Sequence, residues 1–563
     1  MHSLKGAAVS AGVGIGSLVV VPEVSFDTGK YEVTKENIDS EIAKVLDVTA
    51  KLKDILTKRS QATEGEQAEI LQSHIMLLED PAIISDIKKT IEDESANCEY
   101  SLSKVFEKYA DMFFASGDEL FMARAADLRD IKINLLTLLL GMELFEVSNV
   151  KAGSVLYAKE LTTTIAAGID AKNVCGIVTK EGGSTSHMAI IARSLGLPCV
   201  VNIEPLEGSG LVIVDGDKGY VVLNPDNATL AEYEKIQADA EKEKLALEKY
   251  RGLASKTTCG KHIELCCNVG LETEIEQAHK SDAQGIGLFR TEFLYMNRSS
   301  SPLEEEQFKI YKNAAQIFKE EPVIIRTLDV GGDKEIKYLG IDKEENPFLG
   351  FRAIRYCLKN KALFATQIRA ILRASVYGNI KIMLPFVSQI SELLSTRELI
   401  HDIMTELSQK GVDYNKNIDV GIMIETPAAA VMTLQFAKHA DFFSIGTNDL
   451  TQYIMAVDRG NQVVANIYSD YQPAVLNCIF NISQAAKAHG IPCGICGESA
   501  ANPLLTKFFI GSDISELSMA TSSILNIKRV VRSTDYSLVK LKIEQNLDKL
   551  TDVSDTLDFL KSL

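Results

Sequence analysis

The spacing of hydrophobic positions changes twice along the first part of the chain, and each change indicates a different kind of structure. Residues 1–21 place β-branched and small side chains in two runs around a glycine-rich bend, which predicts strand, bend and strand. Between about residues 33 and 142 the apolar positions recur at helical spacing. Short apolar runs then return at 154–157, 176–179, 211–215 and 220–223. We therefore expect an α/β domain of residues 1–25 and 143–228, interrupted by a helical domain of residues 26–142.

A charged segment separates this region from the rest of the chain. Residues 229–251 consist mainly of Ala, Leu, Glu, Lys and other good helix formers, with few large apolar side chains. This composition is typical of an exposed helix, so we expect a linker helix within residues 229–258.

Eight apolar, β-rich runs follow in the remainder of the chain, separated by segments long enough for helices. The runs are 263–269, 285–289, 323–328, 381–385, 420–424, 442–445, 491–495 and 514–517. Eight such alternations predict a (β/α)8 TIM barrel over residues 259–563, with its active site in the loops after the strands. The predicted fold class is a multidomain α/β protein, in which an α/β domain with an inserted helical bundle precedes the barrel.

Composition narrows the possible partners and compartments. The chain has 59 Lys and Arg against 77 Asp and Glu, and its formal charge of −18 argues against nucleic acid or an anionic membrane as the main partner. A basic protein partner would suit this charge. No stretch of about 20 apolar residues lacks charges, so we expect no stable membrane insertion. Ten scattered cysteines indicate free thiols without structural disulfides, and we expect a cytoplasmic protein.

His187 stands in the stretch Gly182-Gly183-Ser184-Thr185-Ser186-His187, between a predicted strand and a predicted helix that Gly196 can end. The hydroxyl residues are natural helix caps, so the histidine lies at a helix start. Exposed amides and the positive end of the helix dipole would stabilise a phosphate on its imidazole. Taken alone, a histidine at such a place is more often structural than chemical.

The stretch from Glu181 to Pro198 closely resembles the phosphohistidine signature of the phosphoenolpyruvate-utilising enzymes. The resemblance covers the paired glycines, Thr-Ser-His and the tail Ala-Arg-Ser-Leu-Gly-Leu-Pro. It implies that His187 is the phosphorylated nucleophile, carried by a swivelling phosphohistidine domain. One departure lies upstream, where residues 160–164 read Glu-Leu-Thr-Thr-Thr and relatives often have Asp-Leu-Thr-Pro-Ser. We expect this loop to affect how the imidazole is oriented.

Two arginines follow predicted barrel strands and would face the same mouth. Arg290 ends the second run and Arg326 ends the third. Guanidinium groups bind phosphate and carboxylate oxygens in pairs, so both suit a substrate that carries both groups. The alternative is a surface ion-pair network, and Arg352 and Arg355 could add to either role.

Two carboxylates end neighbouring strands on the other side of the predicted mouth. Glu425 ends the fifth run and Asp449 follows the sixth. Together they would make a hard oxygen site suited to Mg²⁺, although each could instead cap a helix. The arginines across the mouth favour the metal, and Arg459 supplies a third cation.

The spacing Cys493-Gly494-Ile495-Cys496 is shared by redox and zinc sites, but no second pair accompanies it, so zinc is not expected. Cys496 falls at the end of the seventh run, where a thiol could donate a proton to an enolate carbon. Cys493 is explained more simply as a strand core residue.

Together these motifs resemble the Enzyme I family of the bacterial phosphoenolpyruvate-dependent sugar phosphotransferase system, over nearly the whole chain. The resemblance implies transfer of phosphate from phosphoenolpyruvate to His187 and then to a histidine of the phosphocarrier protein HPr. It also implies a homodimer joined through the barrels. The implied roles are phosphate binding by Arg290 and Arg326, binding of the substrate's polar end by Asn448, Asp449 and Arg459, Mg²⁺ ligation by Glu425 and Asp449, and proton donation by Cys496.

The helical insertion resembles the family's docking surface for HPr over residues 69–81. His74 lies within it and is either part of that surface or a partly buried helix residue.

Two other functions would use parts of the same pattern. Pyruvate phosphate dikinase and phosphoenolpyruvate synthase share the histidine domain and the barrel but need a large ATP-binding domain, for which the residues before His187 leave no room. A scaffold without turnover would have lost the histidine, an arginine or a metal carboxylate, and all of these are present. We therefore expect an active phosphotransferase.

Overall fold

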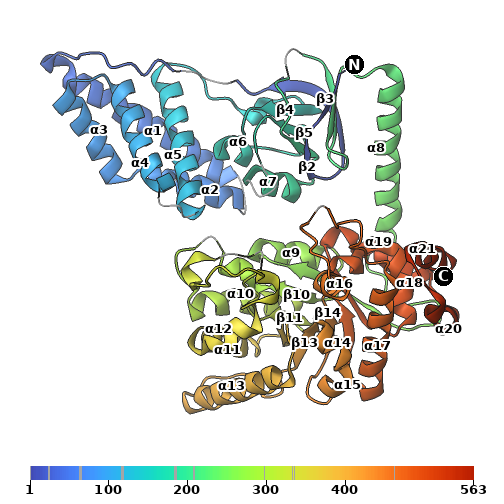
Figure 1. The fold of residues 1–563 in the computed structure, drawn as a ribbon. Helices are drawn as coiled ribbons and strands as arrows, with labels where there is room; N and C mark the ends of the chain where they lie inside the picture. Colours follow the sequence, from blue (N-terminus) through green and yellow to red (C-terminus); the bar gives the residue numbers. More distant parts are fainter. Residues whose placement is uncertain are drawn as a thin grey trace. The chain divides into compact units, whose positions relative to one another are not determined.

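The computed structural model consists of two compact units, which are described separately (Figure 1). The N-terminal unit is Met1–Lys244 and the barrel unit is Leu245–Leu563. The structure describes residues 2–22, 26–62, 66–115, 119–182, 187–206, 209–296, 298–332, 334, 336–461 and 463–563. Among these residues, the structure contains no helix with the length and hydrophobicity that a membrane span requires.

One eight-stranded sheet organises the N-terminal unit, in the order β1-β8-β7-β3-β4-β5-β6-β2. Its strands are β1 (His2–Lys5), β2 (Ala7–Ser10), β3 (Val13–Val20), β4 (Ser154–Ala158), β5 (Val174–Thr179), β6 (Cys199–Val201), β7 (Leu211–Asp215) and β8 (Tyr220–Leu223). Strand β3 pairs in parallel with β4, with Ser17 opposite Ser154, so the chain returns to the same sheet after the helical insertion. The opening residues form three strands rather than the predicted two, and the short β6 was missed.

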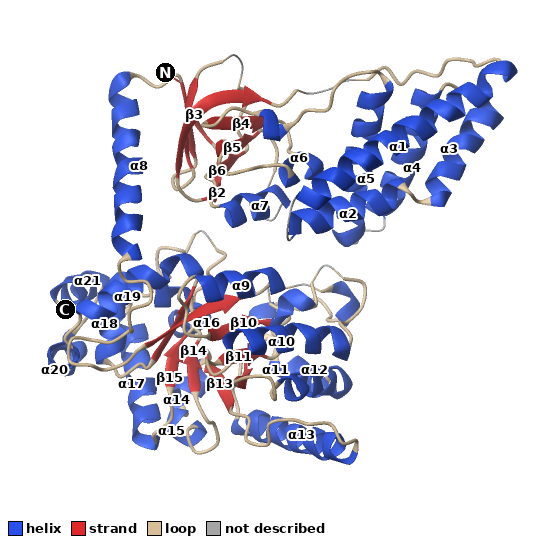
Figure 2. Cartoon of the chain, turned by 180° about the vertical axis from the view of Figure 1, so that it is seen from behind, coloured by secondary structure: helices blue, strands red, loops and turns tan. Residues whose placement is uncertain are grey.

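The helical insertion forms a bundle with its own hydrophobic core, visible beside the strands in Figure 2. Its helices are α1 (Ile38–Ala62), α2 (Glu66–Leu78), α3 (Pro81–Glu94), α4 (Cys98–Ala115) and α5 (Glu119–Leu139). Leu52, Leu102 and Leu128 are completely buried in this core. The helix α3 begins where Asp80 accepts the amide of Ala82 at 2.8 Å and proline takes the first helical position, as expected for a capped start.

Two short helices cover one face of the sheet. They are α6 (Thr163–Ala167) and α7 (His187–Leu195). On α7 the buried residues Met188 and Ala192 are one helical turn apart and pack on Leu156 and Ile177 of the sheet. The helix ends before Gly196, whose φ of +65° is the left-handed conformation that glycine adopts readily, so the predicted stop is confirmed.

Helix α8 (Asn227–Glu248) connects the two units and has no buried residue. Its charged composition explains this, because the helix offers no apolar face that would have to be covered. Near its start, the hydroxyl of Tyr233 donates to Asp215 Oδ2 at 3.0 Å.

The barrel unit contains a closed barrel of eight parallel strands, which confirms the predicted TIM barrel. The strands are β9 (Glu264–Val269), β10 (Ile286–Arg290), β11 (Val323–Arg326), β12 (Ile380–Leu384), β13 (Val420–Ile424), β14 (Phe443–Ile445), β15 (Cys493–Ile495) and β16 (Glu516–Met519). The surrounding helices are α9 (Glu272–Lys280), α10 (Glu304–Phe318), α11 (Ile354–Lys359), α12 (Lys361–Ala374), α13 (Ile390–Gln409), α14 (Pro427–Val431), α15 (Thr433–Phe436), α16 (Thr447–Met455), α17 (Pro473–His489), α18 (Pro503–Gly511), α19 (Ile524–Ser533), α20 (Tyr536–Asn546) and α21 (Val553–Ser562). Short 3₁₀ helices include η3 (Thr291–Leu294) and η6 (Glu498–Ala501).

Side chains alternate between two cores along each barrel strand. Leu265, Ile325 and Ile445 point outward into the large core beneath the helices. The lumen holds a smaller cluster formed by Leu288, Ile324, Met383, Met423, Phe442 and Cys496. This alternation aims polar residues at the strand ends into the barrel mouth.

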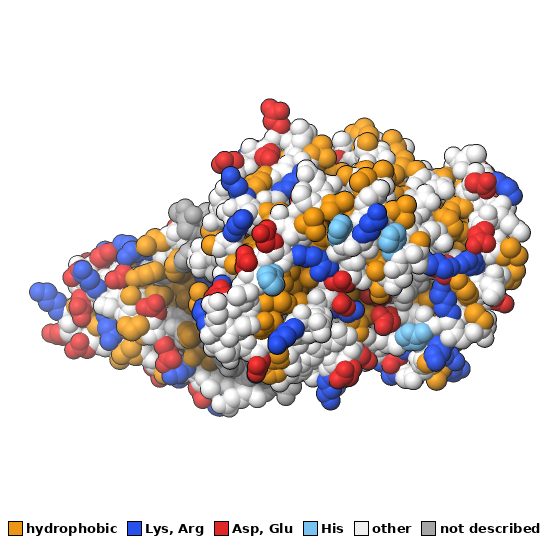
Figure 3. Space-filling model, turned by 90° about the horizontal axis from the view of Figure 1, so that it is seen from below, with side chains coloured by type: hydrophobic (Ala, Val, Ile, Leu, Met, Phe, Trp, Pro, Cys, Tyr) orange, Lys and Arg blue, Asp and Glu red, His pale blue; other side chains and the backbone are white. Residues whose placement is uncertain are grey.

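Charged side chains of both signs are interspersed with hydrophobic ones on the face shown in Figure 3. The excess of acidic residues is therefore not gathered into a single patch on that face.

Candidate active site

A cavity of about 390 Å³ opens at the carboxyl ends of the barrel strands. All seven barrel residues proposed from the sequence line it: Arg290, Arg326, Glu425, Asn448, Asp449, Arg459 and Cys496. They come from strands and loops spread between residues 290 and 496, and parallel strand ends bring them together. This volume is in the range of small-molecule sites.

Arg326 is the centre of a buried charge network on one side of the cavity. Its Nη2 lies 2.5 Å from Glu292 Oε1 and its Nη1 lies 3.2 Å from Asp329 Oδ2. Lys334 contacts the same two carboxylates at 2.7 and 2.9 Å. Burial alone would raise the pKa of Glu292, but Arg326 and Lys334 hold it below its ordinary value. The network thus fixes the guanidinium at the mouth in its charged form.

Arg352 connects this network to the carboxylate on the opposite side. Its Nη2 lies 3.0 Å from Asp329 Oδ1 and 3.2 Å from Asp449 Oδ2, while its plane lies 4.5 Å from the ring of Phe386. Arg355 also stacks on Phe386, but its Nη1 donates to backbone carbonyls of η5 (Pro347–Leu349) and the following glycine. Arg352 therefore belongs to the cavity, and Arg355 has a structural role outside it.

Arg290 differs from the other arginines that line the cavity because it has no ion-pair partner among the residues that the structure describes. It ends β10 at the rim of the cavity, half-buried. Its guanidinium is therefore available for an anionic ligand without first breaking an internal pair.

The two carboxylates proposed as metal ligands meet one test of such a site. Asp449 is buried and its Oδ1 accepts no hydrogen bond from the described residues, although Arg459 Nη1 lies 3.5 Å away. Burial raises the pKa of Glu425 to about 8, with further contributions from the negative charges of Asp449 and Asp329. An unpartnered carboxylate oxygen lies beside a second carboxyl whose charged form is disfavoured by burial. A bound divalent cation would compensate both negative charges. The residues present therefore fit a magnesium-type ion.

Cys496 and Asn448 occupy the side of the cavity formed by β14 and β15. The thiol is buried, which raises the pKa of Cys496 to about 12, so it holds its proton at neutral pH. Asn448 Oδ1 accepts the amide of Glu498 at 2.9 Å, and this bond ties the loop after β15 to α16. Its side-chain amide nitrogen has no acceptor among the described residues and can then face a ligand.

Several cavity residues were not proposed from the sequence. Glu292, Asp329 and Lys334 belong to the charge network, and Tyr468 and Glu498 are further polar members of the lining. Glu292 and Asp329 lie just after the ends of β10 and β11, and the strand-end rule that selected the arginines would have selected them too. Lys334 and Tyr468 lie farther from any strand end and give no comparable signal.

His187 is the first residue of α7 and follows β5, so the predicted helix start is confirmed. The predicted caps Ser184, Thr185 and Ser186 lie outside the described residues. The backbone before them is anchored, because the amide of Glu181 donates to the carbonyl of Lys159 at 2.8 Å. Helix α7, which begins with His187, contacts α6, the helix formed at the end of the 160–164 loop.

That loop forms the start of α6 and is bound to the helical insertion. Thr162 caps α6 by accepting the amide of Ile165 at 3.4 Å. The amide of Thr164 donates to Asp130 Oδ2 of α5 at 2.8 Å, and its hydroxyl lies 3.3 Å from His74 Nδ1. His74 is completely buried, with Nε2 3.0 Å from Asp127. His74 is therefore an internal residue that connects α2, α5 and α6, not a surface residue.

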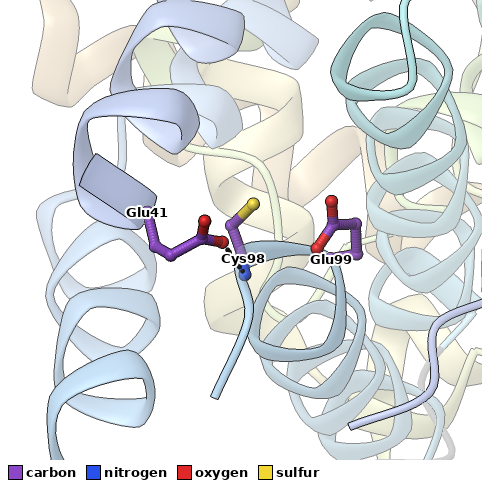
Figure 4. A group of neighbouring side chains, drawn as sticks. All are labelled: Glu41, Cys98 and Glu99. Atoms are coloured by element: carbon purple, nitrogen blue, oxygen red, sulfur yellow. Dashed lines mark hydrogen bonds between the residues drawn. The ribbon is translucent and has the colours of Figure 1, made fainter. Parts of the chain in front are cut away.

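A second group of potential ligand atoms lies in the helical bundle, far from any strand end. Figure 4 shows Glu41 of α1 reaching Cys98, with Glu99 beside it. Glu41 Oε2 accepts the amide of Cys98 at 2.8 Å, and Oε1 accepts from Lys44 at 2.6 Å. Both oxygens of Glu41 are thus engaged, and the group is explained as a cap for the start of α4.

All ten cysteines are free thiols in the structure.

Comparison with known proteins gives matches along nearly the whole chain. Three family descriptions match: "PEP-utilising enzyme, N-terminal" over residues 5–124, "mobile domain" over 150–219 and "PEP-binding domain" over 244–536. Proteins named phosphoenolpyruvate-protein phosphotransferase are similar throughout. The protein from Geobacillus stearothermophilus is 41% identical over 99% of this chain and 98% of its own length. The protein from Priestia megaterium is 38% identical over the same shares.

A solved structure titled as Enzyme I (nEIt) covers 42% of the chain at 31% identity, with a TM-score of 0.39.

Proposed function

This chain belongs to the family of phosphoenolpyruvate-protein phosphotransferases, and from this premise we propose that phosphoenolpyruvate binds in the barrel cavity and phosphorylates His187. The enzyme is a phosphotransferase that uses phosphoenolpyruvate. The observation that carries the residue assignments is the meeting of seven sequence-selected residues in one cavity.

The charges of the cavity suit this substrate. Its lining includes five cationic side chains and five carboxylates, so it is close to neutral before a ligand binds. Phosphoenolpyruvate carries a phosphate and a carboxylate, and a divalent cation would offset most of their charge. Arg290 and Arg326 bind the phosphate in our proposal, while Asn448, Asp449 and Arg459 face the carboxylate end.

We assign the cation site to Glu425 and Asp449 and the ion to Mg²⁺. Both are hard oxygen ligands, and Asp449 Oδ1 is buried without a hydrogen-bond donor among the described residues. When bound, the ion would neutralise charge on the phosphoryl and carboxylate oxygens of the substrate. Arg352, which contacts Asp449 Oδ2, would keep that carboxylate oriented.

His187 attacks the phosphorus in line in this mechanism, and the enolate of pyruvate leaves. The N–P bond forms as the bond between phosphorus and the enolate oxygen breaks, and the arginines stabilise the charge on the equatorial oxygens. Cys496 then gives the proton of its thiol to the methylene carbon of the enolate, which becomes pyruvate. A raised pKa serves this step because the thiol must be protonated beforehand.

The second half of the reaction passes the phosphoryl group to HPr. His187 belongs to the N-terminal unit and the cavity to the barrel unit, so we propose that the α/β domain alternates between phosphoenolpyruvate and HPr. The division into residues 1–25 with 143–228, 26–142, 229–258 and 259–563 remains our proposal for the moving parts. A homodimer formed through the barrels and a cytoplasmic location are part of the same proposal, and the ten free thiols suit the latter.

Phosphoryl transfer from labelled phosphoenolpyruvate tests the assignment. The purified chain is incubated with ³²P-phosphoenolpyruvate and MgCl₂, separated on a gel, and then chased with HPr. We expect labelling of the wild type and of His401→Ala, an exposed histidine of α13 that serves as a matched control. His187→Ala should take up no label. A His187→Ala protein that still labels HPr would refute the proposal.

A further inference from the structure

The lumen of the barrel contains a carboxyl group that the proposed mechanism does not use. Glu516 is the first residue of β16, and its neighbours Leu517 and Met519 point outward into the helix-covered core. By alternation, Glu516 and Ser518 face the lumen. Barrel interiors are dominated by branched aliphatic side chains, so a carboxyl there needs an explanation.

The side chain of Glu516 fills the space directly below Cys496. Gly494 precedes Cys496 by two residues on β15, so it is the next lumen-facing position below the thiol. A Cβ at Gly494 would lie 3.1 Å from Glu516 Cβ and 3.3 Å from its carboxyl carbon. The carboxyl of Glu516 thus occupies the space that a side chain at position 494 would fill. This space lies one lumen-facing layer below Cys496, the proposed proton donor.

Hydroxyl groups line the space between this carboxyl and the thiol. The strand register places Ser444 opposite Gly494, and Gly494 opposite Glu516, so Ser444 and Glu516 flank the glycine at one level. Ser444 Oγ is buried and has no protein partner of ideal geometry, but its hydroxyl interacts with the thiol of Cys496 and opposes the rise of the pKa of that thiol. Glu516 Oε1 is buried without a hydrogen-bond partner among the described residues, and such an atom needs an explanation.

Ser518 extends the polar path toward the mouth. A Cβ at Gly287 of β10 would lie against Glu516 Oε1 and 2.6 Å from Ser518 Oγ. The two oxygens are therefore within about 5 Å of each other, a gap that one water molecule can bridge. Ser518 Oγ lies 2.6 Å from Asn268 Oδ1, and Asn268 Nδ2 donates to the carbonyl of Cys496 at 3.1 Å. Glycines at 287 and 494 leave room for the carboxyl, while Ser518 and Asn268 connect its surroundings to Cys496.

We propose that Glu516 is an internal proton source that restores the thiol of Cys496 after each turnover. This inference rests on the proposed role of Cys496. Once the S–H bond of Cys496 has broken and the new C–H bond of pyruvate has formed, the thiolate takes a proton that leaves the O–H bond of Glu516. The transfer passes through the hydroxyl of Ser444, which interacts with the thiol of Cys496. The carboxylate then regains a proton from water at the opposite end of the barrel.

The surroundings of Glu516 favour its protonated form at rest. Burial raises the pKa of Glu516 to about 8, and the negative charge of Glu264 on β9 adds to this, while Lys381 on β12 opposes it. Lys381 is itself paired with Asp419 at 3.0 Å. The other titratable groups facing this space are the thiols of Cys266 and Cys496, both buried and protonated at neutral pH. A carboxylic acid with this pKa donates readily to a thiolate whose conjugate acid has a pKa of about 12.

Substitution of Glu516 by Gln separates this role from a merely structural one. Formation of the phosphoenzyme in a single turnover is measured by rapid quench. Steady-state formation of pyruvate is measured with phosphoenolpyruvate, MgCl₂ and HPr, through NADH and lactate dehydrogenase. We expect Glu516→Gln to phosphorylate within about twofold of the wild type but to form pyruvate about tenfold more slowly in the steady state. The matched control is Glu276→Gln, which removes an exposed carboxyl of α9 and should not slow turnover.

The pH profile provides the second readout. Glu516 must hold its proton to supply it, so wild-type turnover should fall as the pH rises above about 8. Glu516→Gln should lose this dependence. In a Cys496→Ala background, Glu516→Gln should cause no further loss, because the two residues act in one sequence.

Several outcomes would overturn the proposal. The first is a Glu516→Gln enzyme that turns over at the wild-type rate. The second is a Glu516→Gln substitution that slows phosphorylation of the enzyme and steady-state turnover equally. The third is a loss of turnover from Glu516→Gln that is as large in the Cys496→Ala background as in the wild type. If Glu516→Gln fails to fold, as judged by thermal melting, Gly494→Ala provides the test. The added methyl group retains Glu516 but moves its carboxyl away from its place below Cys496, so turnover should slow in the same way. A Cys496→Ala enzyme with unchanged turnover would instead refute the proposed role of Cys496, so the two failures are distinguishable.

Discussion

Replacing Arg326 by Met tests whether the charges of the cavity stabilise the barrel as well as its substrate. Arg326 is 6% exposed, and its partners Glu292 and Asp329 are each 2% exposed. Methionine keeps part of the side-chain volume but leaves Lys334 as the cation that contacts both carboxylates. Removing one member of a buried ion pair costs about 3 to 5 kcal/mol. That is a large share of the roughly 5 to 15 kcal/mol that stabilise a folded protein.

The same substitution has a predictable dependence on pH. Arg326 and Lys334 hold the pKa of both Glu292 and Asp329 below the ordinary value, against the effect of burial. A carboxyl with a depressed pKa in the folded state adds stability above its unfolded pKa, and this stability is lost as the pH falls through the folded value. The variant lacks much of that contribution. The stability difference between wild type and Arg326→Met should therefore be largest near pH 7 and should narrow below about pH 4.

Urea denaturation followed by circular dichroism at several pH values measures the free energy of unfolding and its dependence on pH. In a thermal melt, a loss of about 3 to 5 kcal/mol should lower the Tm of a unit this large by about 4 to 8 °C. Arg369→Met is the matched control. Arg369 pairs with Glu304 and Glu406 at 3.2 and 3.0 Å, but its side chain is 21% exposed, so we expect a loss of at most about 1 kcal/mol. Equal losses in the two variants, or a difference that does not narrow in acid, would contradict the reasoning.

Two further predictions concern the metal site and the helical insertion. MgCl₂ should raise the Tm of the wild type but not that of Asp449→Asn, because the ion binds only the intact folded site. Differential scanning fluorimetry with and without MgCl₂ measures this shift. An equal shift of the Tm in both proteins would count against the assignment. His74→Leu removes a hydrogen-bond partner from both Thr164 and Asp127, so we expect a loss of about 2 kcal/mol from the N-terminal unit. Thermal melting of this variant is compared with that of the exposed His401→Leu, and indistinguishable curves would contradict the structural role of His74.

The barrel and most of its site could be predicted from the sequence because both depend on local patterns. Each of the eight apolar runs overlaps an observed strand. The rule that parallel strands end at one face then brought Arg290, Glu425 and Cys496 together without any knowledge of their distances. The same rule applies to Glu292, but its role was missed. Glu292 compensates the charge of Arg326, which lies on another strand, and this pairing is visible only in the folded barrel.

Other features depend on tertiary burial, which a single sequence does not reveal. His74 lies at an amphipathic position of a helix, and only the packing of α2 against α5 and α6 makes it internal. Glu516 lies in a run that predicted a strand, but its orientation into the lumen depends on the register of β16 with β15. The strand β6 is only three residues long, too short for a periodic signal.

In our proposal His187 carries the phosphoryl group between the two substrates. The most direct measurement is mass-spectrometric mapping of the phosphorylated chain after incubation with phosphoenolpyruvate and MgCl₂, with digestion at alkaline pH to preserve a P–N bond. We expect one phosphate, on the peptide that contains His187, and its disappearance when HPr is added. A phosphate on any other residue, or one on His187 that HPr fails to remove, would contradict it.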